Sequence, residues 1–328
     1  MTHNQTHNHD NLASAMKLQR CCWTIACALS ILCTTQASLA ATISGSMQEA
    51  FDYPDATSFI NSSTLNGGQG WNANGTTDPN AAAANWGSIL NAGNNRTATS
   101  PGLTYTATGY LAASGNKLTL DAAAANATQN IGRTLGGQTI DTGSTYFSLL
   151  MSKNNDTIRT INWAFFNGTT ERFAVGQIGA AAGNTAGNIA LLMNNNNPAG
   201  LVQNTISPIA MGIGVTHLIV GRIDWNATGN ETVSLWVDPT DVTSEGLAGA
   251  TYLSTSGFEL TAITAVRPFV GNTAGALTAV SANFDEFRLG GTWESVTSGA
   301  VVPEPTTGVL AGLGAISLAL SWRRQKGR

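Results

Sequence analysis

Short runs of hydrophobic and β-branched residues recur along the chain between turns rich in glycine and asparagine. Seven of these runs cover Tyr146–Met151, Ile158–Phe166, Arg172–Ile178, Ile189–Met193, His217–Trp225, Thr232–Val237 and Asn283–Leu289. In the run Thr232–Val237, alternate residues fall on one face, as a half-buried strand requires. Helical periodicity is nearly absent outside two apolar segments near the ends of the chain. The pattern therefore predicts an all-β fold, an antiparallel two-sheet sandwich.

The apolar segment near the N-terminus has the features of a signal peptide. Lys17 and Arg20 precede an apolar run from Cys21 to Cys33, and small residues follow at the end of the segment. We expect residues 1–40 to be a signal peptide that is cleaved between Ala40 and Ala41. Met16 is the alternative start if the polar residues before it are not translated.

The C-terminal segment has three parts in a fixed order. The polar motif consists of Val302, Pro303, Glu304 and Pro305, and an apolar stretch, residues 306–322, follows it. The chain then carries a basic end, 323–328, with Arg323, Arg324, Lys326 and Arg328. This order resembles the PEP-CTERM sorting tail of exported bacterial proteins. The resemblance implies a membrane anchor that an exosortase-type enzyme processes near the Pro-Glu-Pro motif.

The length and charge of this tail agree with a temporary anchor. The fifteen residues from Gly308 to Trp322 span about 22 Å as a helix, less than the roughly 30 Å hydrocarbon core of a bilayer. The basic end favours a cytoplasmic C-terminus and places the preceding domain outside. A buried C-terminal helix of a soluble domain is the alternative, but Val309–Leu320 has no polar face.

The composition of the mature chain excludes several kinds of site. All four cysteines lie between positions 21 and 33, and His217 is the single histidine after the signal peptide. We therefore expect no disulfide, cysteine nucleophile or multi-histidine zinc site in the domain. Nine basic and 17 acidic residues remain once both end segments are removed, a net charge of about −8. Such a surface argues against nucleic acid as a partner.

Several stretches of the mature chain resemble the LamG-like, concanavalin A-type jelly-roll proteins. They are 50–54 (AFDYP), 67–71 (GGQGW), 100–105 (SPGLTY), 115–118 (GNKL), 217–224 (HLIVGRID), 234–239 (SLWVDP) and 283–290 (NFDEFRLG). The resemblance implies two packed antiparallel sheets of about six or seven strands each, with the domain ends near one another. We expect this domain at 41–298 and the sorting tail at 299–328.

Carboxylates are the first candidates for catalysis on this fold. Glycoside hydrolysis needs two carboxylates that face one cleft. No Glu-x-Asp-x-x-Glu string occurs, and adjacent Asp285 and Glu286 should point to opposite faces of a strand. His217, as a lone histidine on a strand, is more readily explained as a structural residue than as a general base. We therefore expect no catalytic residues, with a glycan-active hydrolase or lyase as the alternative.

Charged residues in two of the runs are best explained as ion pairs. Arg222 and Asp224 share a strand face, and Asp285, Glu286 and Arg288 could supply partners from a neighbouring strand. Calcium is the alternative, because LamG-like domains often bind it. No D-x-D-x-D-G loop is present, so we expect no cofactor and name no calcium ligands.

Sugar binding is the activity that the sequence favours. Aromatic rings stack on sugars or fill the core, and the candidates are Trp71, Trp86, Trp163, Trp225, Trp236 and Trp293. We predict an exported protein of the envelope of a Gram-negative-type bacterium. It would be anchored first in the inner membrane and released later to the cell surface or matrix. There it would act as a structural or adhesive component of exopolysaccharide.

Overall fold

The computed structural model describes the core of the chain. The described residues are 46–59, 65, 67–68, 70–71, 85–87, 89–92, 95–111, 115–122, 128–155, 159–178, 187–194, 202–249, 252–254, 259–271 and 279–298. The predicted signal peptide with its cleavage site, and the sorting tail with its motif, apolar stretch and basic end, lie outside them. Within these ranges, no helix is long and apolar enough to cross a membrane.

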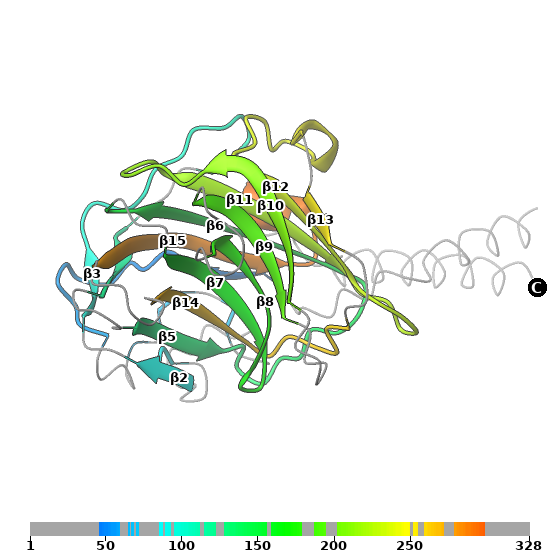
Figure 1. Ribbon diagram of the computed structural model, residues 1–328, viewed down its shortest axis with the longest axis horizontal. Helices are drawn as coiled ribbons and strands as arrows, with labels where there is room; N and C mark the ends of the chain where they lie inside the picture. Colours follow the sequence, from blue (N-terminus) through cyan, green and yellow to red (C-terminus); the bar gives the residue numbers. More distant parts are fainter. Residues whose placement is uncertain are drawn as a thin grey trace, which may run out of the picture. The chain divides into compact units, whose positions relative to one another are not determined.

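Eight antiparallel strands form the first sheet, which we call sheet A (Figure 1). Seven of them follow in spatial order, and the eighth, β1 (Met47–Glu49), pairs with β15. The seven are β13 (Tyr252–Ser254), β12 (Thr232–Val237), β11 (His217–Asp224), β6 (Ser144–Lys153), β15 (Val280–Gly290), β4 (Lys117–Ala122) and β3 (Arg96–Thr99).

Seven antiparallel strands form the second sheet, which we call sheet B. In spatial order they are β10 (Val202–Ala210), β9 (Asn188–Asn194), β8 (Thr170–Gln177), β7 (Thr160–Asn167), β14 (Ala265–Gly271), β5 (Thr128–Thr134) and β2 (Ile89–Ala92). β7 and β8 form a hairpin through a turn at Gly168 and Thr169, where Gly168 has a φ of +57°. Because its central strands come from both halves of the chain, this sheet depends on contacts that are distant in sequence.

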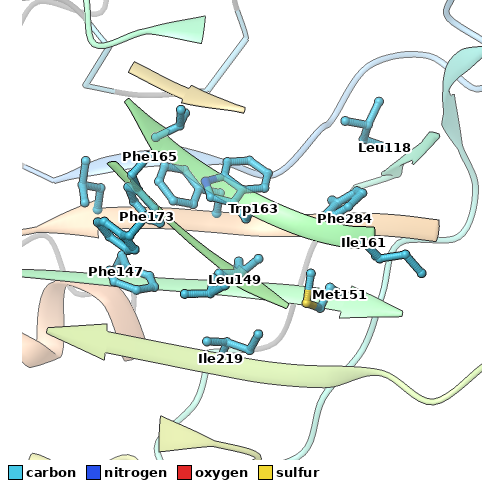
Figure 2. Close-up of a cluster of buried hydrophobic side chains, with 14 of the residues drawn as sticks. Leu118, Phe147, Leu149, Met151, Ile161, Trp163, Phe165, Phe173, Ile219 and Phe284 are labelled. Carbon is cyan, nitrogen blue, oxygen red and sulfur yellow. The ribbon is translucent and has the colours of Figure 1, made fainter. Parts of the chain in front are cut away.

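The main hydrophobic core lies between the two sheets and is built from alternate residues of each strand. In Figure 2, Trp163 and Phe165 of β7 lie near Phe147 of β6 and Phe284 of β15. The ring of Trp163 also stacks on Phe287, with centroids 4.4 Å apart. Gly221 of β11 is required here, because a Cβ atom at this position would meet the Phe147 ring at 2.1 Å.

A second cluster covers the outer face of sheet A, the face turned away from sheet B. Its buried members are Leu103, Leu150, Leu218, Val220, Trp236, Val242, Ala248, Trp293 and Val296. They come from the strands and from three segments that cross this face: the strap 100–111, the loop 239–249 with the 3-10 helix η3 (Glu245–Leu247), and the helix α2 (Trp293–Thr297). Both faces of the central strands of sheet A are therefore buried.

The sandwich predicted from the sequence is confirmed. Each of the seven predicted runs contains a strand, and Val233, Leu235 and Val237 share the inner face of β12 as expected. The strand β1 pairs with β15, Met47 lying opposite Leu289, so the two ends of the described domain are neighbours. Among the described residues, sheet A has eight strands, one more than the resemblance implied, and sheet B has seven, in agreement with it.

Candidate functional site

A row of side chains crosses the outer face of sheet B, the face turned away from the core. Strand pairing places Asn130 of β5 opposite Phe269 of β14, and Phe269 opposite Asn162 of β7. The same row continues through Gly176 of β8 and Ala190 of β9. Figure 1 shows β5, β14, β7, β8 and β9 as neighbours in this order. An aromatic ring thus lies between two amide side chains.

The two amides have unused hydrogen-bonding capacity. Asn162 is 4% exposed and Asn130 is 6% exposed, and the Oδ1 atom of each accepts no hydrogen bond within the part of the chain that the structure describes. A buried acceptor without a partner costs about 1–3 kcal/mol, so such groups in folded proteins are normally satisfied by water or by a bound molecule. Because both oxygens are buried, a hydroxyl group of a ligand could reach them only if the amide side chains turned outward.

An arginine next to this row supplies the positive charge of the face. The guanidinium of Arg267 lies 4.8 Å from the Phe269 ring centroid and 4.7 Å from that of Phe166. Its Nη2 atom donates to Glu171 Oε2 at 2.7 Å, and its Nε atom has no acceptor among the described residues. Burial raises the pKa of Glu171 even though Arg267 opposes the shift. Arg267 therefore retains donor capacity beside the aromatic ring.

Small residues form the surroundings of these polar groups. Ala164 of β7 lies between Arg267 of β14 and Ala174 of β8. Both alanines are buried in one cluster with Ala265 and Phe166. Gly176 has a φ of +134°, and a Cβ atom there would meet Ile161 O at 2.3 Å. Among these side chains, Arg267 and Phe269 are half-buried, whereas Asn162 is buried.

This arrangement is suited to binding more than to catalysis. Aromatic rings with a few placed amide and charged groups are the usual lining of sites for small polar molecules. Within the seven described strands of sheet B, Glu171 is the one carboxylate, and histidine, lysine and tyrosine are absent. Hydrolysis of a glycoside needs two carboxylates, and proton abstraction needs a positioned base. The face offers one carboxylate, which is held by Arg267.

The tryptophans proposed from the sequence for sugar stacking are mostly core residues. Trp71, Trp86 and Trp163 are buried in the main core, and Trp236 and Trp293 are buried in the cluster outside sheet A. Trp225 is partly buried against the core, and its Nε1 atom donates to Thr145 Oγ1 at 3.0 Å. The core-packing alternative therefore holds for the five buried rings, and a sugar-stacking ring must come from another residue.

The carboxylates of β15 depart from the expected alternation. A register shift between Asp285 and Arg288, with a φ of +49° at Glu286, forms a bulge in this strand. Glu286 Oε2 accepts from Arg288 Nη2 at 2.8 Å, and Asp285 Oδ2 accepts from Leu103 N at 2.8 Å. The bulge brings both carboxylates to the outer side of sheet A, so the expectation that they point to opposite faces is wrong. Both are fully buried beneath the strap.

Burial beneath the strap makes Asp285 a weaker acid than an ordinary aspartic acid. Burial raises the pKa of Asp285 to about 8, against the effect of its hydrogen bond from Leu103 N. Between pH 4 and pH 8 the folded state therefore retains a proton that the unfolded state has released. Stability from this group is complete below pH 4 and is lost as the pH rises through 8.

We predict that Asp285→Asn removes this pH dependence. In the unchanged protein, the group should lower the free energy of unfolding by roughly 3–4 kcal/mol between pH 5 and pH 8. Urea unfolding at both pH values measures the difference. The exposed Glu294→Gln variant serves as the control and should keep the full dependence. An equal slope in the Asp285 variant would contradict the assignment.

The remaining charged candidates have structural roles. Arg222 Nε donates to Asp224 Oδ2 at 2.8 Å, which confirms the pair expected on β11. The further partner of Arg222 is Glu245 of η3, so the expectation of partners from β15 is wrong. His217 is buried at the start of β11, where its Nδ1 atom lies 2.7 Å from Asp238 Oδ2. Asp238 also accepts from Leu218 N, so this pair fixes the end of the strand.

The expectations on cofactors stay predictions. Among the residues that the structure describes, no three histidine, cysteine, aspartate or glutamate side chains group closely enough to hold a metal ion. The proposed sorting residues, Val302–Pro305 and the four basic residues of 323–328, and the cleavage site at Ala40 and Ala41 lie outside the described ranges.

The face of sheet B was not identified from the sequence, although a signal was present. In β7 the hydrophobic residues Ile161, Trp163 and Phe165 alternate with Asn162 and Ala164. A polar and a small residue at alternate positions of a strand indicate a face that is not packed against a hydrophobic layer. The pairing of Asn162 with Phe269 depends on strand order, which the sequence pattern does not determine.

Comparison with known proteins identifies the C-terminal segment. Residues 301–325 match the PEP-CTERM protein-sorting motif. The chain is therefore exported, is held by a C-terminal region before processing, and is a substrate of exosortase, a membrane enzyme. No curated protein matches the chain at a significant level.

Several solved structures resemble this chain distantly. They include an endo-beta-1,4-glucuronan lyase from the fungus Trichoderma reesei, at 11% identity and a TM-score of 0.40 over 64% of this chain and 93% of that one. The cellulose induced protein Cip1 has 11% identity and a TM-score of 0.37 over 63% and 89%. The carbohydrate recognition domain of Emp47p has 12% identity and a TM-score of 0.32 over 55% and 84%. These similarities are too distant to indicate a ligand.

Proposed function

We propose that this exported chain, which carries the PEP-CTERM sorting motif, binds a polysaccharide of the cell surface or extracellular matrix through the outer face of sheet B. In this proposal the protein is anchored in the inner membrane until exosortase processes it. The released domain then acts as a structural or adhesive component of the exopolysaccharide.

The row Asn130–Phe269–Asn162 is the observation that carries this proposal. The half-buried ring of Phe269 offers an apolar face to a sugar ring, and the amide groups on either side, whose oxygens are buried in the free protein, would turn outward to accept from its hydroxyl groups. Arg267 adds donors that suit hydroxyl or carboxylate oxygens. The proposed role is non-catalytic, because the strands of this face supply Glu171 as their one carboxylate.

We expect Phe269→Ala and Asn162→Ala to weaken binding of labelled exopolysaccharide from the producing bacterium. Each should lower the affinity about tenfold, which corresponds to about 1.4 kcal/mol. Affinity electrophoresis of the purified variants measures the effect. Asn226→Ala is the matched control, because Asn226 is exposed in a turn after β11, and it should bind normally.

Two results would contradict the proposal. Unchanged retention by both variants would remove this face from the binding site. Formation of new reducing or unsaturated sugar ends during incubation would favour the glycan-active enzyme instead.

A further inference from the structure

The helix α2 ends the described domain and is fixed firmly to sheet A. Trp293 is 4% exposed, donates from Nε1 to Val242 O at 2.7 Å and packs on Trp236 with ring centroids 5.0 Å apart. The capping box of Thr292 and Ser295 closes the first turn of the helix. The chain therefore leaves the domain from one defined place on the outer face of sheet A.

The last carbonyl groups of α2 are also held by neighbouring elements. Arg288 Nη1 donates to Thr297 O at 3.2 Å, and Leu111 N donates to the same atom at 3.1 Å. Ser148 Oγ donates to Val296 O at 2.5 Å. These bonds come from the middle of sheet A and from the strap, so the end of α2 cannot separate from the domain without breaking them.

The sorting motif begins three residues beyond Ser298, the last described residue. Pro303 lies five positions after Ser298, which allows at most about 18 Å of fully extended chain. Gly308, the start of the apolar run, lies ten positions after Ser298, which allows at most about 36 Å. A compact domain of about 250 residues has a radius of gyration of about 18 Å, so this tether is shorter than the domain is wide. An enzyme that acts at the motif must therefore work close to the face that carries α2.

Two exposed leucines flank α2 on this face. Leu111, whose amide bonds to Thr297 O, is 46% exposed, and Leu247, at the end of η3, is 60% exposed. Leu247 precedes Ala248, which packs in the same cluster as Trp293. We call the surface of Leu111, Leu247 and the exposed Glu294 the α2 face.

The charge of the α2 face indicates which kind of partner it suits. The three segments that form it, 105–111, 241–249 and 291–298, contain no basic residue and three acidic residues, of which Glu245 is paired with Arg222. Such a surface gains nothing from anionic lipid headgroups, which attract basic segments. Exposed leucines with acidic neighbours fit instead an apolar protein surface that has basic residues at its edge.

We propose that the α2 face is the surface through which the folded domain contacts its processing enzyme, exosortase, while the motif is in the active site. This contact would supplement recognition of the motif itself, because one short tether joins the motif to the domain that carries the α2 face. Docking of the domain raises the effective concentration of the motif at the enzyme.

The test is the rate of processing in cells that carry the native enzyme, followed by pulse–chase and C-terminal peptide mapping. We expect the Leu111→Ser/Leu247→Ser variant to be processed about fivefold more slowly. Ile213→Ser/Val215→Ser is the matched control, because these residues are similarly exposed, at 54% and 48%. Ile213 pairs with Lys153 at the end of β6. The α2 face lies near the other end of β6, where Tyr146 contacts Trp293 and Glu245. The control should be processed normally, and circular dichroism should show that both variants are folded.

Two further variants distinguish docking from the alternatives. Ten Gly/Ser residues inserted after Ser298 should slow processing, because the longer tether lowers the effective concentration. Leu111→Lys/Leu247→Lys should be as slow as the serine variant. Faster processing with the insertion would mean that the domain obstructs the enzyme, and normal processing of the lysine variant would indicate a lipid surface. Either result, or normal processing of the serine variant, overturns the proposal.

The outcome is separate from that of the proposed polysaccharide binding. The α2 face belongs to sheet A, and the row around Phe269 belongs to sheet B. We therefore expect the leucine variants to bind exopolysaccharide normally.

Discussion

Replacing Arg133 with methionine should lower the free energy of unfolding by about 3–5 kcal/mol, because the change leaves a buried carboxylate without its cation. Arg133 Nη1 donates to Glu49 Oε2 at 2.5 Å, and both side chains are 1% exposed. The same oxygen accepts from Trp86 Nε1 at 2.9 Å, and Phe51 N donates to the other carboxylate oxygen at 3.0 Å. Burial already raises the pKa of Glu49 against the opposing effect of Arg133.

Urea unfolding at pH 7 measures this loss. The double variant Glu49→Gln/Arg133→Met is the control, because it removes both charges and should recover part of the stability. A single Arg133→Met variant within 1 kcal/mol of the unchanged protein would show that the pair contributes little. The arginine also packs on Trp71, at 4.0 Å from the ring centroid, so some loss should remain in the double variant.

Trp293→Ala should also cost about 3–5 kcal/mol, because it removes the largest side chain of α2 from a closed cluster. Its ring meets Trp236 and Tyr146 edge to face, and its Nε1 atom bonds to Val242 O. The change therefore leaves a cavity next to Trp236, Tyr146 and Val242. Thermal and urea unfolding measure the effect.

A second readout separates loss of α2 from general destabilisation. Trp293→Phe keeps an aromatic ring and should lose about 1–2 kcal/mol, chiefly the hydrogen bond to Val242 O. If Trp293→Ala unfolds with the stability of the unchanged protein, α2 would not be part of the cooperative domain. The defined exit of the sorting tail would then lose its support.

The fold could be predicted from the sequence because its strands follow a simple alternation. Val233, Leu235 and Val237 face the core as expected, and the Asn/Gly-rich turns separate the strands. Strands such as β5 and β10 were not predicted because their sequences, TQNIGRT and VQNTISPIA, carry polar residues on both faces. Their pairing with neighbouring strands, and not their own pattern, makes them strands.

The sites were harder to predict for a similar reason. The buried pair of Glu49 and Arg133 joins β1 to β5, which are 84 residues apart. The bulge at Glu286 places its carboxylate on the outer side of sheet A, together with that of Asp285. The alternation of residues along one strand does not reveal such a bulge. The sorting tail, in contrast, is a continuous segment whose order of residues carries its meaning, so it was recognised directly.

The pairing of β1 with β15 has a consequence for export. β15 lies between β6 and β4 and also pairs with β1, so the described strand nearest the C-terminus is an interior strand of sheet A that joins three others. A chain that crosses the membrane behind an N-terminal signal peptide delivers this strand last. Until β15 has been translocated, the edges of β6, β4 and β1 that pair with it therefore stay unpaired. The apolar stretch of the sorting tail follows within about twenty residues of β15. Completion of the fold and arrest of the chain in the membrane are thus close to simultaneous events.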